Sequence, residues 1–441
     1  MDKKQDRKGM NRRTFVKTAV AGAAGLTLSS WGVPTLLKAA NEPLKIGCIF
    51  PLTGPISGYG LPAKAAMEYL CEKMNAKDGI MGRKILPIYR DEQASAEVTV
   101  RALKDLVVNE GCTFVHGTLS SADGIAASLA VKDMNGKAFF GAYGASSVIT
   151  EEKGHRYVLR SSGNSTSWTR VAAIGSVRKW GKDVKTIYCI NPDMAFGHSM
   201  QEEFVAYWKE HAPNAKFIGE KWPPLGCTDF TSYITAIISA KPDLLQSSIY
   251  GGDATIFMKQ ASAYGLLKRV KMVSQDLGLM AFLNDIRKGD PHAPIGVLGG
   301  ALYPFYLFND PEIVEFYTEV YKRSKWYPST MAPAISHYLK LLKFAMEKAG
   351  TTTDLEKVID VYDGGITVNS VGIKYEMRGC DHQGMAPNWV GTLEWDPTGR
   401  FPFPILGKDT VKLDNNAEMY HSCEEVKERR LKEGNTYWYK K

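Results

Sequence analysis

The sequence predicts an α/β fold with two similar halves, each built on a parallel sheet flanked by helices. From Leu44 onward, short apolar runs alternate with stretches whose apolar residues recur at helical spacing. The connections are short, and such a series forms parallel strands with right-handed crossovers. The pattern starts again near residue 157, and 441 residues exceed one ordinary core. We therefore expect two domains that share several crossovers.

The stretch of residues 44–63, LKIGCIFPLTGPISGYGLPA, sets the pattern for the rest. Residues 46–52 are an apolar run bounded by turn residues, which predicts a buried strand. A loop with three glycines and Pro55 follows, and residues 63–74 have helical spacing. Loop amides and the helix dipole make this edge of a doubly wound sheet the expected place for a ligand.

The first half repeats this unit along the chain. Further strands are predicted at residues 85–89, 113–116 and 138–140, and helices at 94–109 and 121–135. Ser121 is the predicted cap of the second of these helices. The second half is predicted to begin with a short strand at 157–160. Its other predicted strands lie at 186–190, 216–221, 244–249, 271–274 and 297–302.

Helices are predicted between these later strands, at residues 167–180 and around Phe204 and Trp208. Three helical segments near 311–326, 331–349 and 354–361 lead to mixed strands from Ile373 onward. Beyond Pro397 the chain is polar and is predicted to be loop-like, with a charged helix near 424–432.

The first 40 residues have the features of an export signal. NRRTFVK at 11–17 resembles the twin-arginine consensus, and an uncharged span at 18–37 and small residues at 39–40 follow. We expect export to the periplasm with cleavage; a retained anchor is the alternative, because about twenty uncharged residues can cross a bilayer. The leader contributes +6 of the formal charge of +8, and the remaining +2 does not indicate nucleic-acid binding.

The cysteines and histidines do not indicate a metal site. None of the seven cysteines lies in a CxxC pair, and the eight histidines form no HExxH motif. Cys48 and Cys189 fall in predicted strands and should be core residues. Cys71 and Cys112 are candidates for a disulfide in an oxidising compartment. The odd number leaves at least one free thiol. We expect no metal and no cofactor.

Several motifs occur in the order found in one protein family. They are PLTGP at 51–55, GYG at 58–60, GTLSS at 117–121, AFG at 195–197, YGG at 250–252 and GCDHQ at 379–383. Together they resemble the type I periplasmic binding proteins that deliver branched-chain amino acids to ABC transporters. The resemblance covers residues 44–396, about four-fifths of the chain.

The resemblance implies an α/β fold of two Rossmann-like lobes joined by three hinge crossovers, which close on a ligand like a trap. The crossovers would lie near residues 161–164, 295–300 and 377–388. The implied lobes are residues 43–162 plus 297–377 and residues 163–296 plus 388–396. Residues 397–441 would form a polar C-terminal extension.

The resemblance also implies a polar part of the binding site. Ser121, with Ser120 beside it, falls where the family binds a ligand carboxylate through a hydroxyl and backbone amides. Tyr143, Gly144, Ala145 and Ser146 fall on the loop that holds the amino and carboxylate groups.

Asp276 falls where an acid pairs with the ligand ammonium. A fixed carboxylate suits a buried ammonium, and a helix N-terminus suits the ligand's carboxylate. Tyr59, Phe196 and Tyr250 would face the apolar part of the ligand.

Three departures from the family bear on the identity of the ligand. The family commonly has Thr near Ala145, so one hydroxyl contact is lost or moved to Ser146. Phe196 lacks the phenol hydroxyl of the usual Tyr, and Tyr143 replaces a small residue. These changes could favour an aromatic acid or an amide over leucine.

The resemblance implies an extracytoplasmic solute-binding protein that is not an enzyme. Its expected partners are a small amino acid or related carboxylate and an ABC permease in the membrane; we expect a monomer that binds no nucleic acid. Two alternatives remain. Gly58-x-Gly60-x-x-Ala63 fits a loose dinucleotide fingerprint, with Asp91 or Glu92 as the ribose-binding acid of an exported oxidoreductase. A ligand-sensing receptor subunit that binds an aromatic acid or amide would share the fold.

Overall fold

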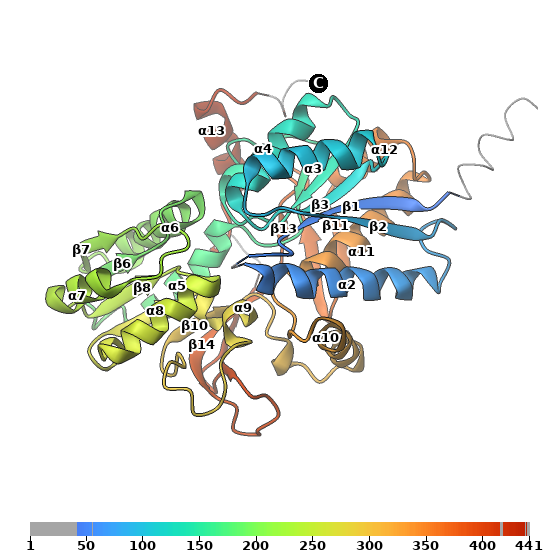
Figure 1. Cartoon of the computed structure of the whole chain (residues 1–441). Coiled ribbons are helices and arrows are strands. Elements are labelled where there is room, and N and C mark those ends of the chain that lie inside the picture. Colours follow the sequence, from blue (N-terminus) through green and yellow to red (C-terminus); the bar gives the residue numbers. More distant parts are fainter. Residues whose placement is uncertain (1–41, 55, 415–417, 437, 439–441) are drawn as a thin grey trace, which may run out of the picture. The chain divides into compact units, whose positions relative to one another are not determined.

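A five-stranded parallel sheet forms the core of the first lobe (Figure 1). The computed structural model describes residues 42–54, 56–414, 418–436 and 438, so the predicted export signal lies outside it. The strands stand in the order β2-β1-β3-β4-β5, with bounds β1 Leu44–Phe50, β2 Ile85–Asp91, β3 Phe114–Gly117, β4 Phe139–Ala142 and β5 Val158–Arg160. In Figure 1, α3 (Ala96–Val108) and α4 (Ser121–Asp133) cover one face, and α2 (Ser57–Asn75) covers the other.

An eight-stranded mixed sheet forms the core of the second lobe. Its main order is β15-β14-β10-β9-β8-β6-β7, and β16 pairs with β14. The parallel strands are β6 Thr186–Ile190, β7 Lys216–Lys221, β8 Leu244–Ser247, β9 Lys271–Ser274 and β10 Leu298–Ala301. The antiparallel strands are β14 Asn388–Trp395, β15 Pro404–Leu406 and β16 Val411–Leu413. The helices of this lobe are α5 Ser165–Trp180, α6 Ala195–His211, α7 Thr231–Ala240, α8 Gly251–Ala263 and α9 Met280–Leu283.

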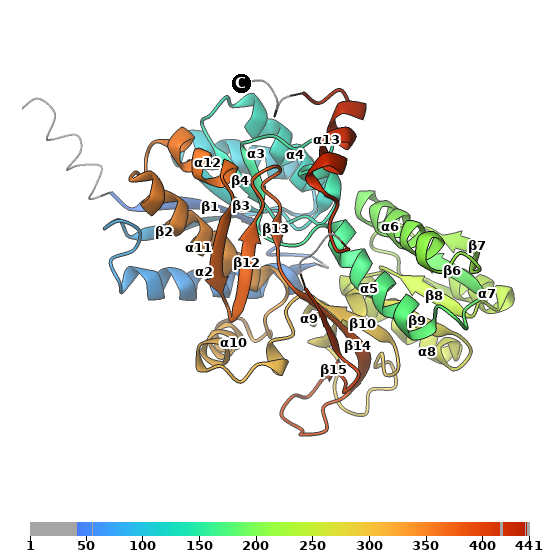
Figure 2. The same ribbon diagram turned by 180° about the vertical axis from the view of Figure 1, so that it is seen from behind.

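The chain returns to the first lobe after β10. The helices α10 (Pro311–Ser324) and α11 (Met331–Ala349) pack against α2, and α12 Leu355–Asp363 packs against α11. A small antiparallel sheet follows, made of β11 Ile366–Ser370, β12 Ile373–Met377 and β13 Gly384–Met385 (Figure 2). The chain then re-enters the second sheet at β14 and ends with α13 Cys423–Lys432. The lobes are thus joined by three crossovers, and the predicted α/β class with two lobes is confirmed.

The start of α2 corrects the sequence prediction. The glycine-rich stretch was predicted to be a loop before a helix at residue 63, but α2 begins at Ser57. Gly60 is needed for close packing within this helix, and not for a loop, because a Cβ at this position would lie 2.0 Å from the carbonyl oxygen of Pro51. The dinucleotide-like glycines Gly58 and Gly60 therefore lie in the first turns of a helix.

Three further assignments were wrong. The strand at 157–160 was predicted to open the second half, but β5 pairs with β4 of the first sheet. The lobe bounds implied by the resemblance placed residues 297–302 in the first lobe, but β10 pairs with β9 in the second sheet, as the order of the predicted strands indicated, and the crossover follows Ala301. The segment beyond Pro397 was predicted to be loop-like, yet it adds β15 and β16 to the second sheet. The predicted helix near 424–432 corresponds to α13.

The disulfide also differs from the expected pair. Cys380 is bonded to Cys423, which fixes the start of α13 to the loop after β12. Cys71 and Cys112 are both free and buried, and Cys48 and Cys189 are buried within strands as predicted. Within the described ranges no helix is long and apolar enough to cross a membrane. The same ranges contain no group of His, Cys, Asp and Glu side chains suited to a metal ion.

Candidate functional site

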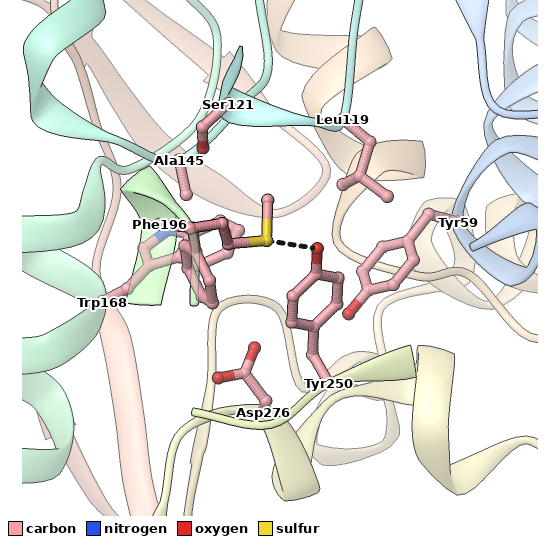
Figure 3. Close-up of a pocket in the computed structure, with 9 residues that line it drawn as sticks. Tyr59, Leu119, Ser121, Ala145, Trp168, Phe196, Tyr250 and Asp276 are labelled. Carbon is pink, nitrogen blue, oxygen red and sulfur yellow. Dashed lines mark hydrogen bonds between the residues drawn. The ribbon is translucent and has the colours of Figure 1, made fainter. Parts of the chain in front are cut away.

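A narrow pocket is lined by loops and helix starts of both lobes (Figure 3). Most of its lining residues follow the carboxyl ends of parallel strands, which is where open α/β sheets bind ligands. The first lobe contributes Tyr59, Leu119, Ser121 and Ala145, and the second contributes Trp168, Met194, Phe196, Tyr250 and Asp276. Five of these nine residues were predicted from the sequence: Tyr59, Ser121, Phe196, Tyr250 and Asp276.

Four aromatic rings form the apolar part of the pocket. Tyr250 makes edge-to-face contacts with Phe196 and Tyr59, with ring centroids 5.3 and 6.5 Å apart. Trp168 meets Phe196 edge-on at 6.2 Å. Figure 3 shows these rings around the space between Ser121 and Asp276. The pocket therefore suits a ligand with a flat or aliphatic body.

Asp276 contributes a carboxyl group to this pocket. It lies in a short 3₁₀ turn, Asp276–Gly278, directly after β9, and it is 2% exposed. Its Oδ2 atom has no hydrogen-bond partner in the described part of the chain. Burial raises the pKa of this carboxyl well above its usual value, because the ionised form is not solvated. A donor or cation on a ligand would supply the missing partner.

Ser121 lies on the opposite side of the pocket from Asp276 (Figure 3). It is the first residue of α4, and its Oγ accepts a hydrogen bond from the amide of Ser146 at 3.1 Å. Ser121 was predicted to cap this helix, but the cap is Ser120, whose Oγ accepts a hydrogen bond from the amide of Asp123. The hydroxyl proton of Ser121 and the helix N-terminus can both favour a ligand carboxylate here.

The amide of Ser120 is not available to a ligand. Both carboxyl oxygens of buried Glu92 are engaged, because Leu119 and Ser120 donate their amides to them at 2.7 and 3.2 Å. Burial, together with the nearby Asp123, raises the pKa of Glu92 to about 8. Thr118 just before this loop has a left-handed φ of 64°, which is unusual for a β-branched residue. Glu92 thus holds the loop that presents Leu119 and Ser121 to the pocket.

We predict that Glu92→Gln destabilises the protein by about 1–3 kcal/mol. Its amide group can accept only one of the two hydrogen bonds and turns its own donors toward a backbone N–H. Urea unfolding of the two proteins would measure the difference. Glu97→Gln is the matched control, since Glu97 is exposed on α3 and forms a surface pair with Arg101 at 3.8 Å; we expect a change below about 0.5 kcal/mol. Equal stabilities for Glu92→Gln and the control would refute this role.

The other predicted residues surround the pocket without lining it. The Tyr143 hydroxyl is hydrogen-bonded to Thr330, and its ring meets Trp168 edge-on at 6.1 Å. The Gly144 carbonyl accepts from buried Arg160. Ser146 contacts Ser199 of α6 through the two hydroxyls, 3.3 Å apart. Tyr143, Gly144, Ser146 and Ser120 therefore support the wall of the pocket.

Four lining residues were missed. Leu119 was not singled out although it lies beside predicted Ser120. Ala145 was placed on the ligand-holding loop, but it was left out of the predicted contacts because it lacks the hydroxyl common in the family. Trp168 and Met194 gave no usable signal, because each could equally be a core residue of its helix or loop. Buried Trp168 also has an indole N–H without a partner in the described residues.

Comparison with known proteins identifies the architecture. The family model described as "Periplasmic binding protein" matches residues 43–399. The Leu/Ile/Val-binding protein homolog 4 of Brucella abortus (strain 2308) is 26% identical over 402 residues, covering 86% of this chain and 89% of that protein.

Two solved structures illustrate the likeness in fold. A solute binding protein of an ABC transporter from Rhodopseudomonas palustris BisB5, in complex with 3,4-dihydroxybenzoic acid, has a TM-score of 0.74 and 21% identity, covering 85% of this chain and 98% of that one. The leucine-, isoleucine-, valine-, threonine- and alanine-binding protein of Brucella ovis, in a closed conformation, has a TM-score of 0.73 and 22% identity. The match covers 86% of this chain and 97% of that one.

Proposed function

Because the chain belongs to the periplasmic binding protein family, we propose that it captures a small amino-acid-like ligand between its lobes and delivers it to an ABC importer. The family implies a location outside the cytoplasm, and NRRTFVK at 11–17 supports export by the twin-arginine route. The observation that carries the proposal is Asp276, a buried carboxyl that lines the pocket and whose Oδ2 has no partner among the described residues. We propose that the protein acts as a monomer.

The pocket accommodates a zwitterion in one orientation. The ligand ammonium would pair with Asp276, where charge-assisted hydrogen bonds are strong because water is excluded. The carboxylate would lie at the Ser121 hydroxyl and the start of α4. The apolar part would contact the rings of Tyr59, Phe196 and Tyr250. Each polar group that the ligand buries then has a partner, as binding sites require.

An aromatic acid is a second candidate, favoured by the four rings of the pocket. Structurally similar proteins are described in complex with 3,4-dihydroxybenzoic acid and 4-hydroxybenzoate. In that case Asp276 would remain protonated and would hydrogen-bond a ring substituent of the ligand. The aromatic body would then stack between Tyr250 and its neighbours. The two candidates differ in whether the ligand carries an amine.

The dinucleotide-dependent enzyme has less support. Asp91, the expected ribose-binding acid, already accepts the amide of Leu52 at 3.0 Å and the hydroxyl of Thr53 at 2.6 Å. The Glu92 carboxyl already accepts hydrogen bonds from the amides of Leu119 and Ser120. A receptor subunit that senses the same ligand would use the same pocket and would differ in its membrane partner.

A thermal-shift screen of the full chain tests the proposal. The panel holds aliphatic and aromatic amino acids, hydroxybenzoates, short amides and nicotinamide dinucleotides. A ligand at a hundred times its dissociation constant adds about 2.7 kcal/mol of stability, which raises the melting temperature visibly. We expect a hit among the amino acids. A hit among the hydroxybenzoates alone would replace the amino acid with the aromatic acid. A dinucleotide hit alone would overturn the proposal.

A further inference from the structure

Most of the side chains that line the pocket are almost fully buried, so we expect ligand entry to require that the two lobes move apart. Tyr59 and Trp168 are each 3% exposed, and they come from different lobes. Contacts that join the lobes therefore set how easily the pocket opens. The C-terminal residues 418–435, called here the strap, make such contacts on both sides (Figure 2).

The beginning of the strap is bound to the second lobe. Glu418 accepts a hydrogen bond from the hydroxyl of Tyr207 at 2.7 Å and lies 3.4 Å from Arg178. Its carbonyl accepts from Arg170 of α5 at 3.2 Å. Met419 and Tyr420 pack into the core that α5 and α6 share with the second sheet.

The end of the strap is bound to the first lobe. Buried Arg430 of α13 donates to the carbonyls of Thr150 and Glu151 at 2.7 and 2.9 Å, and to the carbonyl of Cys380 at 3.2 Å. Asn435 donates to the carbonyls of Glu152 and Gly154. The Cys380–Cys423 disulfide fixes α13 to the loop that precedes the third crossover.

His421 links the two lobes directly. Its Nδ1 lies 2.8 Å from the carboxyl of Glu151 in the first lobe, and its Nε2 lies 3.1 Å from that of Glu203 on α6. The side chains of all three residues are at most 8% exposed. Arg429 lies between the same groups, 3.0 Å from Glu152 and 3.6 Å from both Glu151 and Glu203.

Glu151 and Glu203 face the two ring nitrogens of His421 and favour its protonated form, whereas Arg429, whose Nη2 lies 3.1 Å from Nε2, opposes it. With His421 protonated, Glu151, Glu152 and Glu203 face three cations, His421, Arg429 and Arg170, the last 3.5 Å from Glu203. Other charged groups nearby are Arg378, which donates to the His421 carbonyl, Glu425 of α13, and Arg430, which donates to the Glu151 carbonyl. Burial opposes the charge on His421, but its hydrogen bonds to Glu151 and Glu203 raise its pKa to about 9.

We propose that residues 418–435 are a strap that holds the two lobes together around the pocket, with His421 as the link between them. Separating the lobes would pull Glu151 away from Glu203, so His421 and Arg429 would lose partners on one side. Buried ion pairs that lose one partner are strongly destabilised. The strap therefore opposes opening, whichever ligand the pocket binds.

Hydrogen–deuterium exchange on the ligand-free full chain at pH 7 tests this inference. We expect His421→Gln to raise exchange at least threefold in pocket peptides from both lobes, such as residues 118–124 and 272–280. His198→Gln is the matched control, because His198 pairs with Asp193 at 2.9 Å on the exposed surface of one lobe. Glu203→Gln keeps the inference testable if His421→Gln does not fold. Faster exchange confined to α13 and residues 150–154 would overturn it.

A pH series gives a second readout. A histidine whose pKa is raised on folding adds stability that is complete below its unfolded value, near 6.5, and is lost as the pH rises through about 9. We therefore expect the stability difference between wild type and His421→Gln to be largest near pH 6 and to fade above pH 9. A difference independent of pH would contradict the protonated link.

Discussion

Asp276→Asn is expected to abolish amino-acid binding while leaving the fold intact. Truncating one partner of a buried charge pair costs about 2–5 kcal/mol or more, which is at least a 30-fold loss of affinity. Calorimetry with the best amino acid from the thermal-shift panel would measure the loss. Asp253→Asn is a matched control: Asp253 is buried on α8 of the same lobe, but its carboxyl is partnered by the amide of Gly226. An unchanged affinity of Asp276→Asn would contradict the proposal that Asp276 pairs with the ligand ammonium.

The same substitution should stabilise the ligand-free protein at neutral pH. The folded-state pKa of Asp276 is raised, so the folded protein keeps a proton that the unfolded chain releases above about pH 3.9. Wild-type stability relative to Asp276→Asn therefore falls as the pH rises from there to the folded pKa. Urea unfolding at pH 4 and pH 7 checks the sign. A difference that grows in favour of wild type would contradict the unpaired carboxyl.

Tyr250→Ala is expected to give the second large loss of affinity. The substitution removes the ring that touches both Phe196 and Tyr59 and leaves a void in the aromatic wall. Removing a large buried side chain costs about 3–5 kcal/mol in a core, and a similar penalty on binding predicts a loss above 100-fold.

Tyr250→Phe distinguishes the contribution of the ring to affinity from that of the hydroxyl. In the described part of the chain the hydroxyl donates to the sulfur of Met194 at 3.5 Å, and such a contact is weak. We expect Tyr250→Phe to bind within about threefold of wild type, because the aromatic contacts remain. Calorimetry on both variants measures the two affinities. Equal losses in Tyr250→Ala and Tyr250→Phe would assign binding to the hydroxyl instead of the ring.

The alternation of strands and helices was visible in the sequence because parallel strands are continuous apolar runs. The bounds of β6, β7 and β9 were predicted as found. The start of α2 was missed because Gly58 and Gly60 resemble loop residues, whereas Gly60 serves close contact with Pro51. Strand pairing across long separations, as in β10 with β14, has no local signal.

The site residues that were predicted correctly are those whose place in the sequence, at the end of a strand, determines their place in the pocket. Ser121, Phe196, Tyr250 and Asp276 lie at or just after strand ends, and the motif register located them there. Trp168 was missed because it lies within α5, whose buried residues extend around the helix. The Cys380–Cys423 bond was missed because only the folded chain brings these residues together.

A crystal structure of the full chain with the best amino acid from the panel tests the central claim most directly. The account predicts the ligand ammonium within about 2.7–3.2 Å of the Asp276 carboxylate. It also predicts the ligand carboxylate at the Ser121 hydroxyl and the side chain against Tyr250. A ligand bound outside this pocket, or one whose carboxylate faces Asp276, would contradict the account.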